Sequence, residues 1–103
     1  MKRIVLVILF FPILLWSQAN FEKAEQLLEA GKTDQARLMF ENIVKENPSH
    51  IKTIERLGDI AGQKKSWDKA LSYYKKLILL QPTEANYYYK YGGALGMKAK
   101  EVN

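Results

Sequence analysis

The stretches "TDQARLMFENIVKENP" (33–48) and "WDKALSYYKKLILLQP" (67–82) follow the same pattern of residues, 34 positions apart. In each stretch, an acidic residue near the start is followed by an alanine, an aromatic residue and a closing proline. The matched residues are Asp34 and Asp68, Ala36 and Ala70, Phe40 and Tyr74, and Pro48 and Pro82. Self-similarity at a fixed period of roughly 20 to 50 residues is the sequence signature of a repeat architecture.

The chain after residue 19 has the apolar spacing of helices. Apolar residues recur every three or four positions, and Gly31, Pro48 and Pro82 separate the segments that contain them. Neither a polar–apolar alternation nor an Asn-Gly turn indicates strands. Because the linkers are short, consecutive helices should lie antiparallel, and the sequence predicts an all-α fold of antiparallel helix pairs. We expect helices near 20–30, 34–46, 50–63, 67–80 and 84–98.

Small residues occur at one equivalent position of each unit, namely Ala24, Gly58 and Gly92. We expect the first helix of each pair to approach the second closely at this position. One helix pair cannot bury its apolar face alone, so the pairs should stack on one another. The packing positions expected from the pattern are Ala24, Ala36, Phe40, Pro48, Leu57, Gly58, Ala70, Tyr74, Pro82, Tyr88 and Gly92.

The middle of the chain reads Ile54-x-x-Leu57-Gly58-x-x-Ala61, then Ala70-x-x-x-Tyr74 and Pro82. This order resembles the tetratricopeptide repeat, a 34-residue helix–turn–helix unit with a large residue, Leu-Gly, Tyr, Ala-x-x-x-Phe and Pro. The unit before it matches best in its second helix, and a third unit begins at Tyr88.

The resemblance implies a short right-handed superhelix of about two and a half repeats. The expected division is a signal peptide at 1–19, repeats at 20–50 and 51–84, and the first helix of an incomplete third repeat at 85–103. The resemblance also implies a scaffold or adaptor that binds other proteins.

The start of the chain has the order of a secretory signal peptide. Two basic residues precede the apolar run "IVLVILFFPILLW" (4–16), and small residues follow in "SQA". The run is shorter than the roughly 20 residues that a membrane-spanning helix needs. We expect cleavage after Ser17 or Ala19 and export, to the periplasm in a bacterium with two membranes. The alternatives are an uncleaved anchor in the inner membrane that holds a structural subunit facing the periplasm, and an apolar core helix.

The remaining composition argues against catalysis and against nucleic acid. The net charge of +5 falls to a mild +3 without the two basic residues of the signal segment (14 Lys+Arg against 11 Asp+Glu), so no clustered basic face is indicated. The chain has no cysteine and one histidine, His50, which we expect to be solvated in a turn. A metal site needs several ligands at close spacing. We therefore expect no enzyme activity, no metal and no cofactor.

The resemblance implies a concave surface that the first helix of each pair lines and that binds a partner segment. Residues one step past the packing positions should face it. These are Phe21, Glu25, Leu28, Glu29, Glu55, Asp59, Tyr89 and Gly93, which we call the groove face. Its middle is acidic and its ends are aromatic, so charge complementarity favours a basic or mixed basic-apolar protein or peptide. An ordinary solvated face is the alternative.

Two further surfaces stand out in the sequence. The lysines of the fourth helical segment should form a solvated face, with lipid-headgroup contact as the alternative. The segment 84–98 lacks the polar outer face that a terminal repeat helix normally has. Its positions outside the expected packing are Tyr87, Tyr89, Gly93, Gly96 and Met97. We expect Tyr91 and Leu95 to pack back on the helix at 67–80. We also expect either a repeat protein that continues after residue 103 or a second copy that covers this helix.

Overall fold

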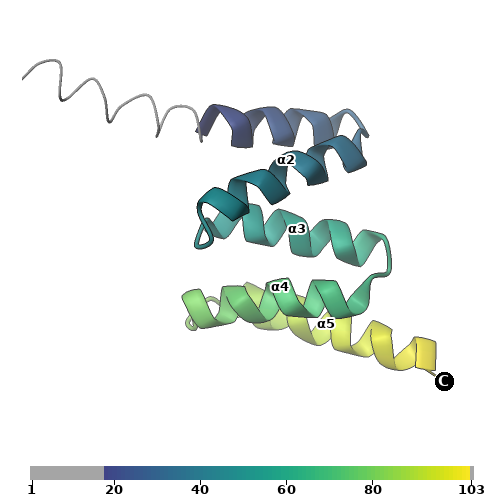
Figure 1. Cartoon of the computed structure of the whole chain (residues 1–103). Helices are drawn as coiled ribbons and strands as arrows, with labels where there is room; N and C mark the ends of the chain where they lie inside the picture. The colour runs from purple at the N-terminus through teal and green to yellow at the C-terminus, as the bar shows by residue number, and fades with distance from the viewer. Residues whose placement is uncertain (1–17, 103) are drawn as a thin grey trace, which may run out of the picture.

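The computed structural model describes residues 18–102, so most of the predicted signal peptide lies outside the described residues. Residues 18–29 form a helix, followed by α2 (Thr33–Glu46), α3 (Ile51–Gln63), α4 (Trp67–Leu80) and α5 (Ala85–Val102). Consecutive helices pack against each other and reverse direction at each turn (Figure 1). No strand occurs between residues 18 and 102, which confirms the all-α prediction. None of the helices in this range is both long and apolar enough to span a membrane.

The turns within the two helix pairs have the same geometry, 34 residues apart. Lys32 N–H donates to Leu27 O at 2.9 Å, and Ser66 N–H donates to Ala61 O at 2.9 Å. This bond over five residues marks a Schellman motif, whose residue before the donor has a positive φ. That residue is Gly31 (φ 79°) in the first turn and a lysine (φ 59°) in the second.

Prolines end the second helix of each pair. Asn47 and Gln81, the residues before Pro48 and Pro82, have φ near −131° and −137° with ψ of 85° and 77°. Proline disfavours the helical region for the residue that precedes it. The two helices therefore end at equivalent positions, as the repeated sequence indicates.

Two connected clusters form the core. The first lies between the helix at 18–29, α2 and α3, around Ala24, Ala36 and Phe40. The second lies between α3, α4 and α5, around Ala70 and Tyr74. All of these residues are buried, with none more than 6% exposed. Each cluster joins one helix pair to the next helix, which is how stacked pairs bury a continuous core.

The last helix differs from the expectation. Tyr88, expected to pack, is 48% exposed, whereas Tyr87 is only 6% exposed and belongs to the core beside α4. Tyr91 is partly buried against the same cluster, and Leu95 is exposed. A Cβ placed at Gly92 would meet no atom within 4 Å. Tyr88 and Gly92 face a side of α5 against which no described helix packs, so their expected partners are missing there.

The end of α5 also differs from the expected 84–98. The helix continues to Val102 and is still helical at Ala99. Ala99 is equivalent to Gly31 and Lys65, at which the first two helix pairs turn. Alanine has the highest helix propensity, and no positive φ interrupts the helix at this position.

Candidate partner-binding surface

The first helix of each pair contributes to the groove face. Phe21, Glu25, Leu28 and Glu29 lie on the helix at 18–29, Glu55 and Asp59 on α3, and Tyr89 and Gly93 on α5. The helix at 18–29 and α3 precede, in their pairs, the helices that carry Phe40 and Tyr74 in the core, and α5 is the last helix of the described range.

A lysine that the sequence did not assign to the groove face lies between the acidic residues in the middle of that face. Lys90 on α5 places its Nζ 2.8 Å from Glu55 Oε2 and 2.9 Å from both carboxylate oxygens of Asp59. Burial lowers the pKa of Lys90, but the hydrogen bonds to Glu55 and Asp59 outweigh it, and the pKa is raised overall. The two carboxylates therefore share one ammonium group and keep a net negative charge between them.

The hydroxyl of Tyr74 completes this cluster from α4. It donates a hydrogen bond to Asp59 Oδ1 at 2.6 Å. Burial, and then this bond to a carboxylate, raises the pKa of Tyr74 well above its ordinary value. The Lys90 ammonium also lies 6.0 Å from the centre of the Tyr74 ring, within reach of a cation–π interaction. A core aromatic residue thus fixes the orientation of a groove-face carboxylate.

A second ion pair neutralises part of the groove face between the first helix and α3. Arg56 Nε donates to Glu25 Oε1 at 2.5 Å. The hydrogen bond to Glu25 raises the pKa of Arg56. Glu29, one turn further along the first helix, is exposed and makes no ion pair with any residue of the described range.

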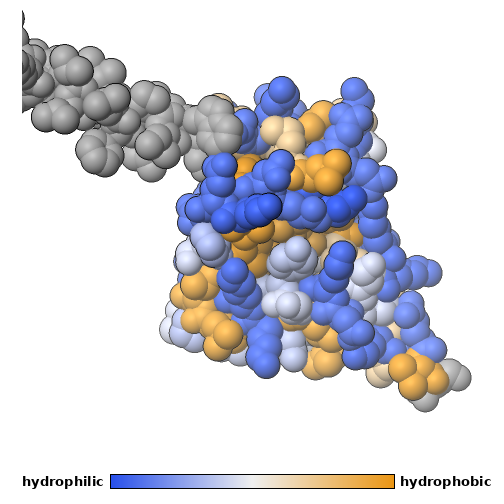
Figure 2. All heavy atoms as spheres, in the orientation of Figure 1, coloured by the Kyte–Doolittle hydropathy of each residue, from blue (hydrophilic) through white to orange (hydrophobic). Residues whose placement is uncertain are grey.

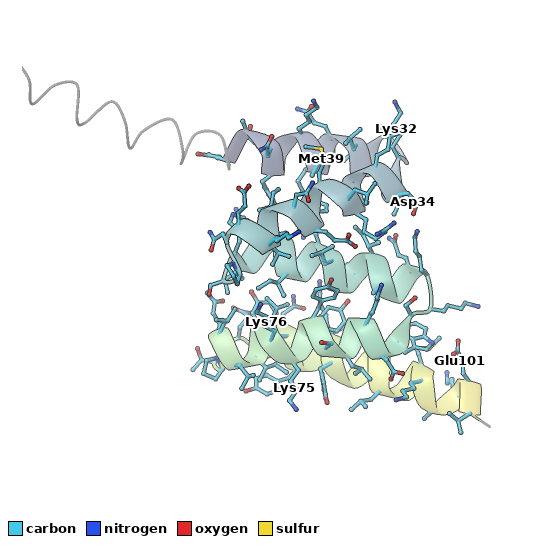
Figure 3. The ribbon with its side chains drawn as sticks, viewed as in Figure 1. Lys32, Asp34, Met39, Lys75, Lys76 and Glu101 are labelled. Carbon is cyan, nitrogen blue, oxygen red and sulfur yellow. The ribbon has the colours of Figure 1, made fainter. Side chains whose placement is uncertain are left out.

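The ion pairs between helix pairs repeat with the sequence period. Glu25–Arg56 and Asp59–Lys90 are related by a shift of 34 residues at both partners. Two further pairs, Asp34–Lys64 and Asp68–Lys98, are related in the same way, and Asp34 lies at the start of α2 (Figure 3). In each pair the base follows the acid at three or four positions less than the repeat period, a spacing that could have revealed these pairs in the sequence.

The aromatic ends of the groove face are not alike. The Phe21 ring lies 5.7 Å from the Phe40 ring and 5.4 Å from the His50 ring, so it packs at the edge of the core. Leu28 packs against the same cluster. In contrast, Tyr89 is 81% exposed and Gly93 is uncovered. The α5 end is therefore the accessible aromatic part of the surface.

A hollow of about 510 Å³ extends the groove face at this end. Aromatic, glycine and methionine residues from α3, α4 and α5 line most of it, together with Lys90 and Ala94. The lining residues are Gly62, Trp67, Tyr74, Tyr88, Tyr89, Lys90, Gly92, Gly93, Ala94 and Met97. Such a concave, mostly apolar surface with one charged group is typical of a binding site.

Residues 18–50, the first helix pair, match the family model of the tetratricopeptide repeat. The chain therefore contains a tetratricopeptide repeat. The matched segment covers the first helix and α2, and α3 and α4 repeat its turn and its core contacts. No curated protein matches the chain. Tetratricopeptide repeats generally mediate binding between proteins, and members of the family are typically scaffolds without enzyme activity.

The single histidine of the chain has a structural role that its sequence context did not predict. His50 is the N-cap of α3, and its Nδ1 accepts a hydrogen bond from Thr53 N–H at 3.3 Å. The Thr53 hydroxyl lies 2.8 Å from the same nitrogen, and Thr53 is fully buried. His50 is only partly exposed, because it packs beside Phe21, and is therefore not a freely solvated turn residue.

The lysines of α4 lie on the outside of this repeat protein. Lys75 and Lys76 are exposed (Figure 3), whereas Lys64 before α4 pairs with Asp34. Figure 2 shows hydrophilic side chains over much of this side of the molecule, with an apolar patch at the end of α5. The α4 face has the appearance of an ordinary solvated surface.

Proposed function

We propose that this protein binds a basic or mixed basic-apolar segment of another protein on its groove face. The observation that carries the proposal is the excess of acid on that face. Glu25, Glu29, Glu55 and Asp59 face only two cations, Arg56 and Lys90, among the described residues. The surface therefore keeps a negative potential, and attraction of opposite charge speeds association.

The apolar part of such a segment would bind at the α5 end. Tyr89 and Gly93 lie beside the hollow there, and the Tyr89 ring is largely exposed. A tyrosine supplies a large contact area and loses little side-chain entropy on binding. A segment with basic residues followed by an apolar residue would then reach both parts of the surface.

Binding of fluorescent basic-apolar peptides tests this function. We expect Glu29→Lys to weaken binding, because Glu29 adds negative charge without holding an ion pair of the described fold. Glu46→Lys makes the same charge change at an exposed position near the end of α2 and should leave binding unchanged. Higher salt should weaken binding to the parent protein, since exposed charges are screened. Equal effects of the two variants on peptide binding would argue against the groove face as the binding site.

We also propose that the protein is exported, with its signal peptide removed. The support is the order of basic, apolar and small residues at 1–19. The mass of the intact exported protein should correspond to a chain that begins at Gln18 or Asn20. A full-length species held in the membrane would support the anchored alternative instead.

A further inference from the structure

A small hollow of about 290 Å³ lies where α2, α3 and α4 meet. Its floor is apolar, because Leu57, Ile60 and Ala61 of α3 are buried there. Polar side chains of α2, of α4 and of the turn between α3 and α4 form its walls. None of the lining residues belongs to the groove face, and none lies on α5. The hollow is therefore a second concave feature of the molecule, separate from the first.

Three cations surround the hollow. Arg37 Nη1 donates to Glu41 Oε1 at 2.8 Å, and both residues line the hollow. Lys64, also in the lining, pairs with Asp34 just outside it. Lys69 makes no ion pair with any residue between 18 and 102. Three positive and two negative side chains thus meet here, and one positive charge is left uncompensated.

Three donors at the hollow have no acceptor among the described residues. They are the ammonium group of Lys69 and the hydroxyls of Ser66 and Tyr73. Ser66 is the N-cap of α4, but its side chain makes no capping hydrogen bond. Tyr73 is partly buried and packs against both core clusters, so its ring is held in place. An anion in the hollow would supply the missing acceptor, and hydrogen bonds to a charged group are stronger than neutral ones.

We propose that this hollow binds a small carboxylate with an apolar body, of about the size of benzoate. The carboxylate accepts from Lys69 and Tyr73, and from Arg37, which keeps donors besides the one that it gives to Glu41. The apolar body lies against the α3 floor and the Tyr73 ring. A dianion such as phosphate fits less well, because only one positive charge is uncompensated and Glu41 repels a second negative charge.

The hollow does not follow from the repeat period. The residues 34 positions after Arg37 and Glu41 are Leu71 and Lys75, so the next helix pair does not reproduce this ion pair. Tyr73 directly precedes the core position of Tyr74 and is not itself one of the packing positions that the pattern predicts. The site is thus a property of this chain and not of the repeated unit. It is also independent of the segment proposed to bind on the groove face.

A titration followed by NMR tests the proposal. Benzoate is added to the isotope-labelled full chain, and we expect amide shifts to gather at residues 37–41, 57–61 and 64–73. Benzamide has the same ring without the charge, and inorganic phosphate has charge without the ring. Both should bind at least about tenfold more weakly than benzoate, as for loss of a hydrogen bond to a charged group or of the apolar contact.

Variants of the full chain assign the binding to the hollow. Lys69→Met removes the uncompensated charge and should weaken benzoate binding by about tenfold. Lys76→Met makes the same change at an exposed position of the same helix (Figure 3) and should leave binding unchanged. Tyr73→Phe keeps the ring but removes its hydroxyl, and it should weaken binding severalfold. Because Lys69 is exposed, circular dichroism should show an intact fold for its variant.

Four results would overturn the proposal. The first is the absence of shifts around the hollow at millimolar benzoate. The second is equal binding of benzoate and benzamide, which would leave the cations without a role. The third is binding of phosphate as tight as that of benzoate, because the site would then hold any anion. The fourth is an equal effect of Lys69→Met and Lys76→Met on the affinity for benzoate.

Discussion

Tyr74 on α4 covers Gly58 on α3 so closely that any side chain at residue 58 would collide with the aromatic ring. Gly92 has the equivalent position on α5 and has no neighbour within 4 Å. Two glycines that the sequence period treats as the same therefore have different environments. Substitution of each by the same residue should have opposite effects on stability.

Gly58→Ala should destabilise the fold, and Gly92→Ala should stabilise it. The alanine at 58 forces the Tyr74 ring out of place, and overpacking costs about 1–3 kcal/mol. The alanine at 92 only improves helix propensity, by about 1 kcal/mol. Urea denaturation of both variants measures the two changes. A similar change of the same sign in both variants would contradict the different packing of the two positions.

Lys65→Gly should stabilise the protein. Lys65 has a φ of 59° in the turn between α3 and α4, and the left-handed region costs a non-glycine residue about 1–2 kcal/mol. Glycine removes this strain but adds entropy to the unfolded chain, so we expect a net gain of up to about 1 kcal/mol. The reciprocal variant, Gly31→Lys, should destabilise the first turn. Thermal unfolding of both variants, which should shift in opposite directions, checks the prediction.

Lys90→Met should destabilise the junction of α3 and α5. Methionine keeps the length of the side chain but leaves the carboxylates of Glu55 and Asp59 facing each other without a cation. Loss of a charged hydrogen-bond partner in a partly buried site costs about 1–3 kcal/mol. Lys100→Met, at an exposed position of the same helix, is the control and should be nearly neutral. The double variant Lys90→Met/Asp59→Asn should recover part of the lost stability, because it removes one of the two unpaired carboxylates.

The protein should lose stability in alkali. Burial, together with Asp59, raises the pKa of Tyr74, and the carboxylates of Glu55 and Asp59 raise that of Lys90 against burial. Both groups thus hold their protons more tightly in the folded state. Their contribution is complete below the unfolded pKa values of about 10 and is lost as the pH rises above them.

The variant Tyr74→Phe isolates the contribution of the tyrosine to this pH dependence. It should be less stable than the parent near pH 8, because the bond to Asp59 is lost. Its free energy of unfolding should also fall less steeply above pH 10. Chemical denaturation between pH 8 and pH 12 measures both effects. If the free energy of unfolding fell equally steeply with pH in both proteins, Tyr74 would not hold its proton more tightly in the folded state.

His50→Ala should destabilise α3 from its N-terminus. The variant removes the nitrogen that accepts from Thr53 N–H, and loss of an N-cap costs about 1 kcal/mol. His50→Asn keeps an acceptor at the N-cap and should retain most of the stability. Thermal unfolding compares the two variants, and equal melting temperatures would assign the role of His50 to its contact with Phe21 rather than to the cap.

The local sequence determined the helices and the ends of α2 and α4. Pro48 and Pro82 stop α2 and α4 at equivalent positions, because proline restricts the residue before it. The period of 34 residues paired Ala36 with Ala70 and Phe40 with Tyr74 as equivalent core positions, and all four residues are buried. Such features depend on short-range backbone rules and on a one-dimensional repeat, both of which can be inferred from the sequence alone.

Tertiary structure decided which equivalent positions acquire a neighbour. Periodicity treats Gly58 and Gly92 alike and favours Tyr88 over Tyr87 for burial, but the outcome depends on which helix lies on each side of α5. The same holds for Lys90, whose role follows from the distance between α3 and α5 and not from its neighbours in sequence. The sequence by itself determined the helices, their turns and their equivalence. Only their packing in space decided the contacts, because burial and ion pairing require a partner at close range.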